Sequence, residues 1–229
     1  MSLEVKKSVT KIIPKIILVI IAILLGCFFI KVAIWENKYY AEKEGSERAV
    51  SPVMGDLETA KVSEEEVTPA QRAEYTVAPD KPRYLYIDKL GISKARIMEV
   101  GINSKGQMQT PYSIFDAGWF TGSSLPGEGG TTILDGHNGG PGVNGIFKNL
   151  NKLEAGDMIR IEMGDGTVYT YRVYDNFEVK LSEANKKMQL LATSPVSGEE
   201  SISIISCIGE WSLKQQTYLS RQFLRATRV

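Results

Sequence analysis

From Pro82 onward, short runs of apolar and β-branched residues alternate with polar turns that contain Gly, Pro, Asn and Asp. Runs of this length and composition are typical of strands in an all-β domain. Gly164-Asp165-Gly166 has the composition of a tight turn, which would join two strands into a hairpin. Two short helices are expected at residues 144–153 and 182–190, with Ser182 capping the second. The pattern predicts a small β-barrel with strands at residues 84–87, 96–100, 117–120, 131–136, 158–163, 167–176, 201–207 and 219–227.

A different pattern precedes this region. Residues 12–35 are apolar except for Lys15 and Lys31 near the two ends. A helix of this length spans a hydrocarbon core of about 30 Å, and both lysines can extend toward the headgroups. Residues 1–11 are rich in lysine, which predicts a cytoplasmic N-terminus and export of everything after the helix. The sequence therefore predicts a single-pass protein of the cell membrane with an extracytoplasmic domain.

The alternative for the apolar segment is a cleaved signal peptide, but no Ala-x-Ala site follows it. Leu24-Leu-Gly-Cys27 resembles a lipoprotein cleavage box, yet Phe28-Phe-Ile continues the apolar run. We therefore expect an uncleaved anchor with Cys27 in the lipid. Cys207 is then the only exported thiol, and an exported free thiol favours a catalytic role.

Residues 36–81 are rich in Glu, Lys, Ser and Ala and include the like-charged run Glu64-Glu65-Glu66. Their few large apolar residues cannot form a core, so we interpret them as an extracytoplasmic linker. Short helical stretches are compatible with residues 36–47 and 64–74. A lid over a functional site is the alternative.

The composition adds two limits. The 229 residues, 43% of them hydrophobic, suffice for one domain with additional segments. The formal net charge is zero, so the sequence gives no indication of a nucleic-acid partner.

Three residues whose side chains could take part in catalysis lie at the ends of predicted strands. Cys207 ends an apolar run, His137 is the only histidine and follows another, and Arg221 opens the last. Each has an ordinary alternative: a buried small side chain, a turn residue and a surface charge. Together they fit acyl transfer, in which a thiolate attacks a carbonyl, a cation stabilises the oxyanion and an imidazole protonates the leaving amine. The residues alone support cysteine acyl transfer and nothing finer.

The same residues resemble the signatures of a known family. Ser203-Ile-Ile-Ser-Cys207 is similar to the Thr-Leu-x-Thr-Cys motif of the sortases, and Gly136-His137 and Arg221 match their other two signatures in the same chain order. The resemblance covers residues 82–229. It implies a sortase-type barrel in which Cys207 is the nucleophile, His137 the general acid and base, and Arg221 the oxyanion or substrate donor.

The resemblance also implies a reaction and its partners. It points to transpeptidation of secreted proteins that carry a Leu-Pro-x-Thr-Gly-like sorting signal, with an amine of a peptidoglycan precursor or a pilin lysine as acceptor. No cofactor is expected. No metal is expected either, because the acidic residues that could bind calcium, as in some relatives, lack a ligand spacing; these are Glu128, Glu183, Glu199 and Glu200.

Protonation limits such a pair of residues. With unperturbed pKa values, about 3% of Cys207 is thiolate and about a quarter of His137 is protonated at pH 7. If the two titrate independently, on the order of 1% of molecules hold the active pair. A nearby charge could change that fraction.

At two positions the family pattern leaves an alternative open. Arg225 shares a strand face with Arg221 and is the alternative cation. Asp135 stands where family members often carry a small residue beside the groove. Residues 133, 135 and 137 share a face of a strand, so a groove-facing Asp135 is expected to raise the pKa of His137. The alternative is that Asp135 caps a turn in solvent.

Other classes of protein are the remaining alternatives. Papain-like peptidases place cysteine before histidine, the reverse of the order here. L,D-transpeptidases resemble a His-Gly-Cys-x-Arg motif, whereas Cys207 follows serine. A membrane-tethered β-barrel binding module without catalysis is the third alternative, and it predicts an inert, buried thiol.

Overall fold

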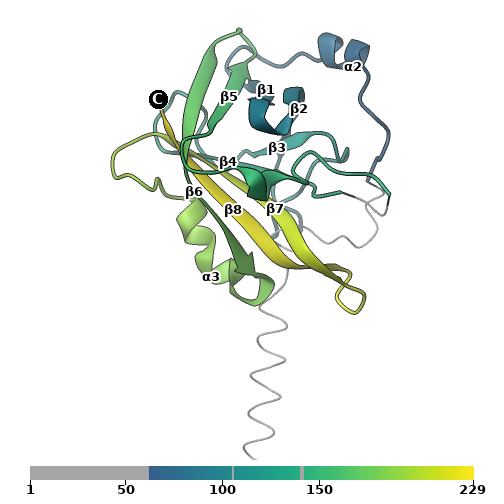
Figure 1. Cartoon of the computed structure of the whole chain (residues 1–229). Helices are drawn as coiled ribbons and strands as arrows, with labels where there is room; N and C mark the ends of the chain where they lie inside the picture. The colour runs from purple at the N-terminus through teal and green to yellow at the C-terminus, as the bar shows by residue number, and fades with distance from the viewer. Residues whose placement is uncertain (1–61, 105, 140–141) are drawn as a thin grey trace, which may run out of the picture. The chain divides into compact units, whose positions relative to one another are not determined.

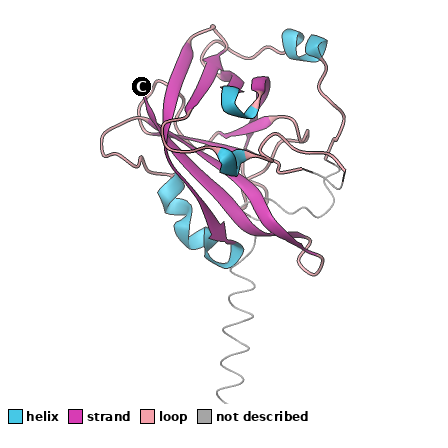
Figure 2. Ribbon diagram, viewed as in Figure 1, coloured by secondary structure: helices cyan, strands magenta, loops and turns pink. Residues whose placement is uncertain are grey.

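The structure is a computed structural model that describes residues 62–104, 106–139 and 142–229. Eight strands in these ranges close into a barrel in the order β1-β2-β3-β4-β7-β8-β6-β5 (Figure 1). Strands account for most of the regular structure (Figure 2). The predicted eight-stranded all-β barrel is confirmed. Its strands are β1 (Pro82–Ile87), β2 (Ile92–Val100), β3 (Ala117–Phe120), β4 (Thr131–Gly136), β5 (Met158–Met163), β6 (Val168–Lys180), β7 (Ser201–Ser212) and β8 (Thr217–Arg228).

The largest difference from the predicted strands concerns the segment after Cys207. A loop was expected there, but β7 continues to Ser212 and forms a long hairpin with β8. The pairing register shifts between Ile208 and Trp211, and Gly209 lies there with φ 87°. A bulge with a glycine in this conformation lets a strand pass an irregularity without ending. The turn chemistry of the sequence was therefore mistaken for a strand end.

The helix at residues 182–190 is confirmed as α3 (Leu181–Leu191), although its N-cap is Lys180 and not Ser182. The helix expected at residues 144–153 is wrong. Only the 3₁₀ turn η2 (Leu150–Lys152) forms there. The Gly145 and Phe147 amides donate to the carbonyls of Asn138 and His137, at 2.9 and 3.0 Å. Backbone groups paired in this way hold the segment in an irregular path beside the end of β4.

Side chains alternate between the two faces of the central strands, as strand geometry requires. Leu134, Ile204 and Leu224 belong to the cluster that fills the barrel. Ile133, which precedes Leu134 in β4, belongs to a second cluster on the outer face together with residues of α3. The outer face of β4, β7 and β8 is therefore partly apolar, and its predicted reactive residues lie beside this second cluster.

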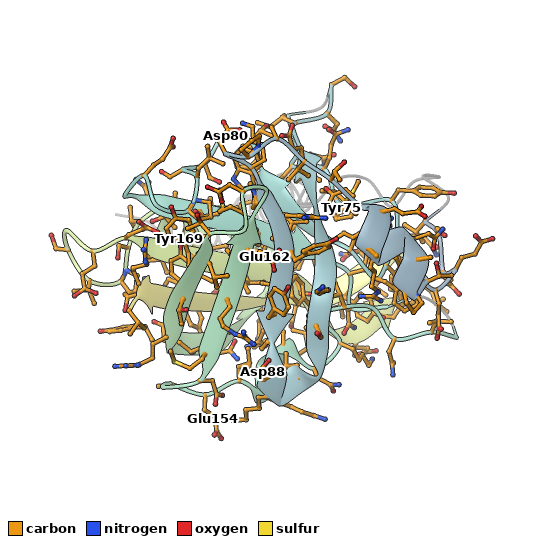
Figure 3. All side chains as sticks on the ribbon, turned by 90° about the horizontal axis from the view of Figure 1, so that it is seen from above. Tyr75, Asp80, Asp88, Glu154, Glu162 and Tyr169 are labelled. Atoms are coloured by element: carbon orange, nitrogen blue, oxygen red, sulfur yellow. The ribbon has the colours of Figure 1, made fainter. Side chains whose placement is uncertain are left out.

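The first described residues pack along the barrel. Ser63 pairs with the chain at Ser113, where the Ile114 amide donates to the Ser63 carbonyl at 3.0 Å. The helix α2 (Pro69–Glu74) follows, within the stretch where a helix was expected, and Thr68 caps it. The Tyr75 hydroxyl donates to the Ile97 carbonyl of β2 at 2.5 Å, and Tyr75 lies beside the barrel strands (Figure 3). These contacts fix the entry of the chain into the barrel.

The predictions for residues 1–11, for the membrane helix at 12–35 and for the linker up to residue 61 fall outside the described residues. Within the described ranges, the helices are too short or too polar to cross a bilayer.

Candidate active site

Strand pairing brings the three predicted site residues together. The parallel β4–β7 ladder places Gly136 opposite Ser206, so His137 and Cys207 follow one position later on neighbouring strands. The antiparallel β7–β8 ladder places Cys207 directly opposite Arg221. The Ser206 hydroxyl donates to the Gly136 carbonyl at 2.9 Å and ties β4 to β7 at this level. Cysteine therefore lies between histidine on one side and arginine on the other.

Cys207 is a free, half-buried thiol at the outer face of β7. Burial raises the pKa of Cys207, because the thiolate would lose its hydration. The Arg221 guanidinium lowers this pKa, and a charge on Asp135 would raise it further. Burial is the largest effect, so the thiol is neutral in the resting protein at neutral pH.

His137 is 8% exposed and directs its ring toward the connection between β2 and β3. Its Nε2 lies 2.8 Å from the Pro111 carbonyl oxygen. A carbonyl only accepts, so the proton of the neutral ring resides on Nε2 and Nδ1 is left as an acceptor. Burial lowers the pKa of His137, while the Pro111 carbonyl acts in the opposite direction.

Arg221 is 1% exposed and its guanidinium is held by its own hairpin. Nη1 donates to the Tyr218 and Ser220 carbonyls at 2.9 and 3.0 Å, and Nη2 donates to the Thr217 hydroxyl at 3.2 Å. Within the described part of the chain, Nε has no acceptor. A fixed guanidinium whose Nε–H is unused is suited to donate to an oxygen that arrives with a ligand.

The rival arginine is engaged elsewhere. Arg225 lies opposite Ser203, further along the ladder from the thiol. Its Nε donates to Asp175 Oδ1 at 2.9 Å and its Nη2 contacts the second carboxylate oxygen of Asp175. A cation paired twice with a carboxylate has little to offer to a distant oxyanion, so the geometry favours Arg221 as the cation beside Cys207.

Asp135 lies on the outer face of β4, between Gly118 of β3 and Ile205 of β7. The expectation that it shares the face of the site is correct, but its expected effect on histidine is wrong. Asp135 is fully buried, and burial raises its pKa well above the usual range, which favours the protonated carboxyl. Without an anion beside it, the pKa of His137 falls with burial and does not rise.

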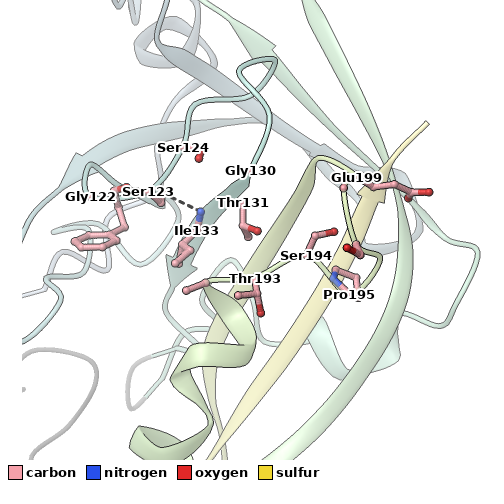
Figure 4. A pocket seen from close by; sticks show the side chains of 14 residues that line it. Gly122, Ser123, Ser124, Gly130, Thr131, Ile133, Thr193, Ser194, Pro195 and Glu199 are labelled. Carbon is pink, nitrogen blue, oxygen red and sulfur yellow. Dashed lines mark hydrogen bonds between the residues drawn. The ribbon is translucent and has the colours of Figure 1, made fainter.

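A depression of about 780 Å³ opens on the same face, at the start of β4 (Figure 4). Phe120 and Ile133 line it from the strands, and residues 192–199 line it from the segment that follows α3. This depression could not be predicted from the sequence, because the loop residues that line it carry no periodicity. The only signal was the Ser-, Gly- and Pro-rich composition of residues 192–199.

Comparisons with known proteins agree on one family. A family model of the sortase domain matches residues 85–229. No curated protein gives a match. Solved structures with partial similarity include a lid mutant of sortase A from Corynebacterium diphtheriae (25% identity, 69% of this chain and 73% of that chain, TM-score 0.47). They also include sortase C1 from Streptococcus agalactiae (24%, 72% and 78%, 0.48) and sortase C-1 from Actinomyces oris (24%, 83% and 98%, 0.48).

With TM-scores below 0.5, these structures add no weight of their own, and the assignment rests on the family model. That model covers most of the chain, including every strand from β2 to β8. Assignment to this family of enzymes argues against the other classes considered, namely papain-like peptidases, L,D-transpeptidases and non-catalytic binding modules. The chain belongs to the sortase family of cysteine transpeptidases.

Proposed function

We propose that this chain is a membrane-anchored sortase that cleaves a Leu-Pro-x-Thr-Gly-like sorting signal through a thioacyl-enzyme at Cys207 and passes the acyl group to an amine. The observation that carries the proposal is the ladder register, in which Cys207 lies opposite Arg221 and next to β4, whose end His137 directly follows. A nucleophile, a proton donor and a cation thus meet on three adjacent strands.

In the first half of the reaction, the Cys207 thiol gives its proton to His137, and the sulfur forms a bond to the carbonyl carbon of the scissile peptide bond. The carbonyl oxygen becomes an oxyanion, which the free Nε–H of Arg221 stabilises. The carbon–nitrogen bond then breaks, and the leaving amine takes a proton from His137. The products are a thioester on Cys207 and a new amino terminus on the released fragment.

In the second half, the acceptor amine attacks the thioester carbonyl and gives a proton to His137. The carbon–sulfur bond breaks, the departing Cys207 thiolate takes this proton from His137, and a new amide forms, so that both residues return to their resting state. The acceptor in this proposal is an amine of a peptidoglycan precursor or a pilin lysine, and the donors are secreted proteins that carry the sorting signal.

The experiment is to incubate the full chain in detergent with a small library of Leu-Pro-x-Thr-Gly peptides and to measure the intact protein mass. A mass increase equal to the acyl fragment that ends in Thr, reversed by hydroxylamine, is the expected result. Cleavage at another bond, or no adduct on Cys207 with any peptide of the library, would refute the proposed substrate.

The proposal also includes the anchor at residues 12–35 and the export of residues 36–229. The test is made in intact cells with a membrane-impermeant thiol reagent and with carbonate extraction. We expect Cys207 to be labelled from outside and the full chain to resist extraction. A chain that is extracted by carbonate, or a Cys207 that reacts only after lysis, would contradict the proposed location.

A further inference from the structure

One buried polar group on the catalytic face has no explanation in the reaction described so far. Asp135 is fully buried, and neither carboxyl oxygen has a hydrogen-bond partner among the described residues. A buried polar group without a partner destabilises a fold, so its presence in the middle of a strand points to a purpose other than stability. Gly118, opposite on β3, leaves the space that the carboxyl occupies: a Cβ there would lie 2.1 Å from Asp135 Oδ1.

Asp135 lies between two parts of the site, the depression and the reactive residues. Outward-facing residues of β4 follow one another at about 6.6 Å, in the order Ile133, Asp135, His137. Ile133 lines the depression, and His137 lies beside Cys207. A peptide that occupies the depression and also presents a carbonyl to the Cys207 sulfur must therefore cross the level of Asp135.

The chemistry of Asp135 fits such a peptide. A neutral carboxylic acid offers one donor and one acceptor. A residue of an extended peptide presents a carbonyl and an amide N–H on the same edge, and together they form the complementary pair. An ionised carboxylate would lack the donor, and the burial of Asp135, which raises its pKa, favours the form that has it.

We propose that Asp135, as a carboxylic acid, binds the backbone of the acyl-donor peptide between the depression and Cys207, donating to a carbonyl and accepting from an amide N–H. The inference rests on the proposed function and assigns a binding role to a buried residue that the proposed reaction does not use. Asp135 then orients the scissile bond through the substrate and does not take part in proton transfer.

The peptide must replace what covers Asp135 in the structure shown. Met108, from the connection between β2 and β3, belongs to the same outer cluster as Ile133 and Ile205. Pro111 of that connection also lies close, since its Cδ would be 3.1 Å from a Cβ on Gly118. Both covering groups belong to a connection and not to a strand, so their displacement leaves the barrel ladders intact.

The test uses the full chain, a fluorogenic Leu-Pro-Ala-Thr-Gly peptide and three variants. Asp135→Ala removes both polar atoms, whereas Asp135→Asn keeps a donor and an acceptor in the same shape. Thr132→Val is the matched control, because the Thr132 hydroxyl is also buried and unpaired on β4 but lies on the opposite face, toward the barrel interior. Thermal denaturation and the rate of alkylation of Cys207 by iodoacetamide are measured for each variant.

We expect Asp135→Ala to raise KM roughly tenfold, the effect of losing one or two neutral hydrogen bonds, while the alkylation rate stays within about twofold. Asp135→Asn should restore most of the lost affinity, and Thr132→Val should leave KM unchanged. The inference is overturned if Asp135→Ala keeps the KM of the parent, if Asp135→Asn is as impaired as Asp135→Ala, or if kcat and thermal stability fall while KM does not change. A parent protein that forms no thioester with the peptide would instead remove the proposed function, and this inference with it.

Discussion

Replacing Arg221 by lysine should nearly abolish transfer although the positive charge is kept. Lysine has no equivalent of the Nε–H, the guanidinium donor left without a partner in the described structure. Losing one donor to the oxyanion typically costs about 2.7–4 kcal/mol, which corresponds to a rate reduced roughly a hundredfold or more. The effect should fall on acyl-enzyme formation, because the oxyanion forms as Cys207 attacks.

The same substitution should also affect stability, and the two effects can be separated. The Tyr218 and Ser220 carbonyls and the Thr217 hydroxyl each receive a hydrogen bond from the guanidinium. A lysine ammonium cannot reach all three, and each buried acceptor left unpaired costs about 1–3 kcal/mol. Urea denaturation measures this loss, and single-turnover thioester formation under conditions where the variant is folded measures the chemical one.

Arg225→Lys is the matched control, since it changes the same chemical group on the same strand. Arg225 forms a partly buried pair with Asp175, and lysine keeps the positive charge opposite this carboxylate. We expect a small loss of stability and thioester formation within a fewfold of the parent. If Arg225→Lys is the damaging change and Arg221→Lys the mild one, the cation has been assigned to the wrong residue.

Three further outcomes are expected. Cys207→Ala should abolish cleavage and thioester formation with an unchanged thermal transition, whereas Cys27→Ala should leave both unaltered; residual turnover in the first variant would contradict a covalent mechanism. In the Cys27→Ala background, the rate of alkylation of Cys207 by iodoacetamide should rise with pH around a midpoint above that of an ordinary thiol, because burial raises the pKa of Cys207. The midpoint should rise further in Arg221→Gln, which removes the positive charge that lowers this pKa. A midpoint below the ordinary range would contradict the described environment. Gly118→Ala should destabilise the protein by about 1–3 kcal/mol in urea denaturation, since its Cβ would collide with Asp135, whereas Gly142→Ala, which meets nothing within 4 Å, should change little.

The barrel could be predicted because short apolar and β-branched runs are separated by turn residues. Such a run is a local signal, and it identified β4 and the buried part of β7 closely. The extension of β7 beyond Cys207 depends on pairing with β8, and a glycine at a bulge has the same composition as a glycine in a loop. The helix expected at residues 144–153 failed for a similar reason. The amides of Gly145, Ile146 and Phe147 bond to carbonyls outside the segment, and the later amides bond only to the carbonyl three residues before them.

The three reactive residues could be predicted because they match the sortase signatures in the same chain order. Their positions in the strands were predicted less well, since Cys207 and Arg221 lie within β7 and β8 and only His137 directly follows the end of a strand. Their environment could not be predicted. The partner of His137 is the Pro111 carbonyl, which comes from a connection with no periodic signal. Whether Asp135 is charged depends on the space left by Gly118 and on the cover above it, both set by tertiary packing. The sequence therefore identified the chemical groups, while their protonation required the structure.

Burial of the site determines both its efficiency and its durability. Ordinary pKa values would put the active ion pair at about 1% of molecules at pH 7. Here the pKa of Cys207 is raised and that of His137 is lowered, so both shifts reduce this fraction. A thiol that is neutral and half-buried is also slow to oxidise, because oxidation follows thiolate character and exposure. For a domain exported as proposed, the low reactivity of the resting enzyme protects the nucleophile. Arg221 acts in the opposite direction. It lies opposite Cys207 and lowers the pKa of that thiol, which increases the fraction of thiolate available for attack.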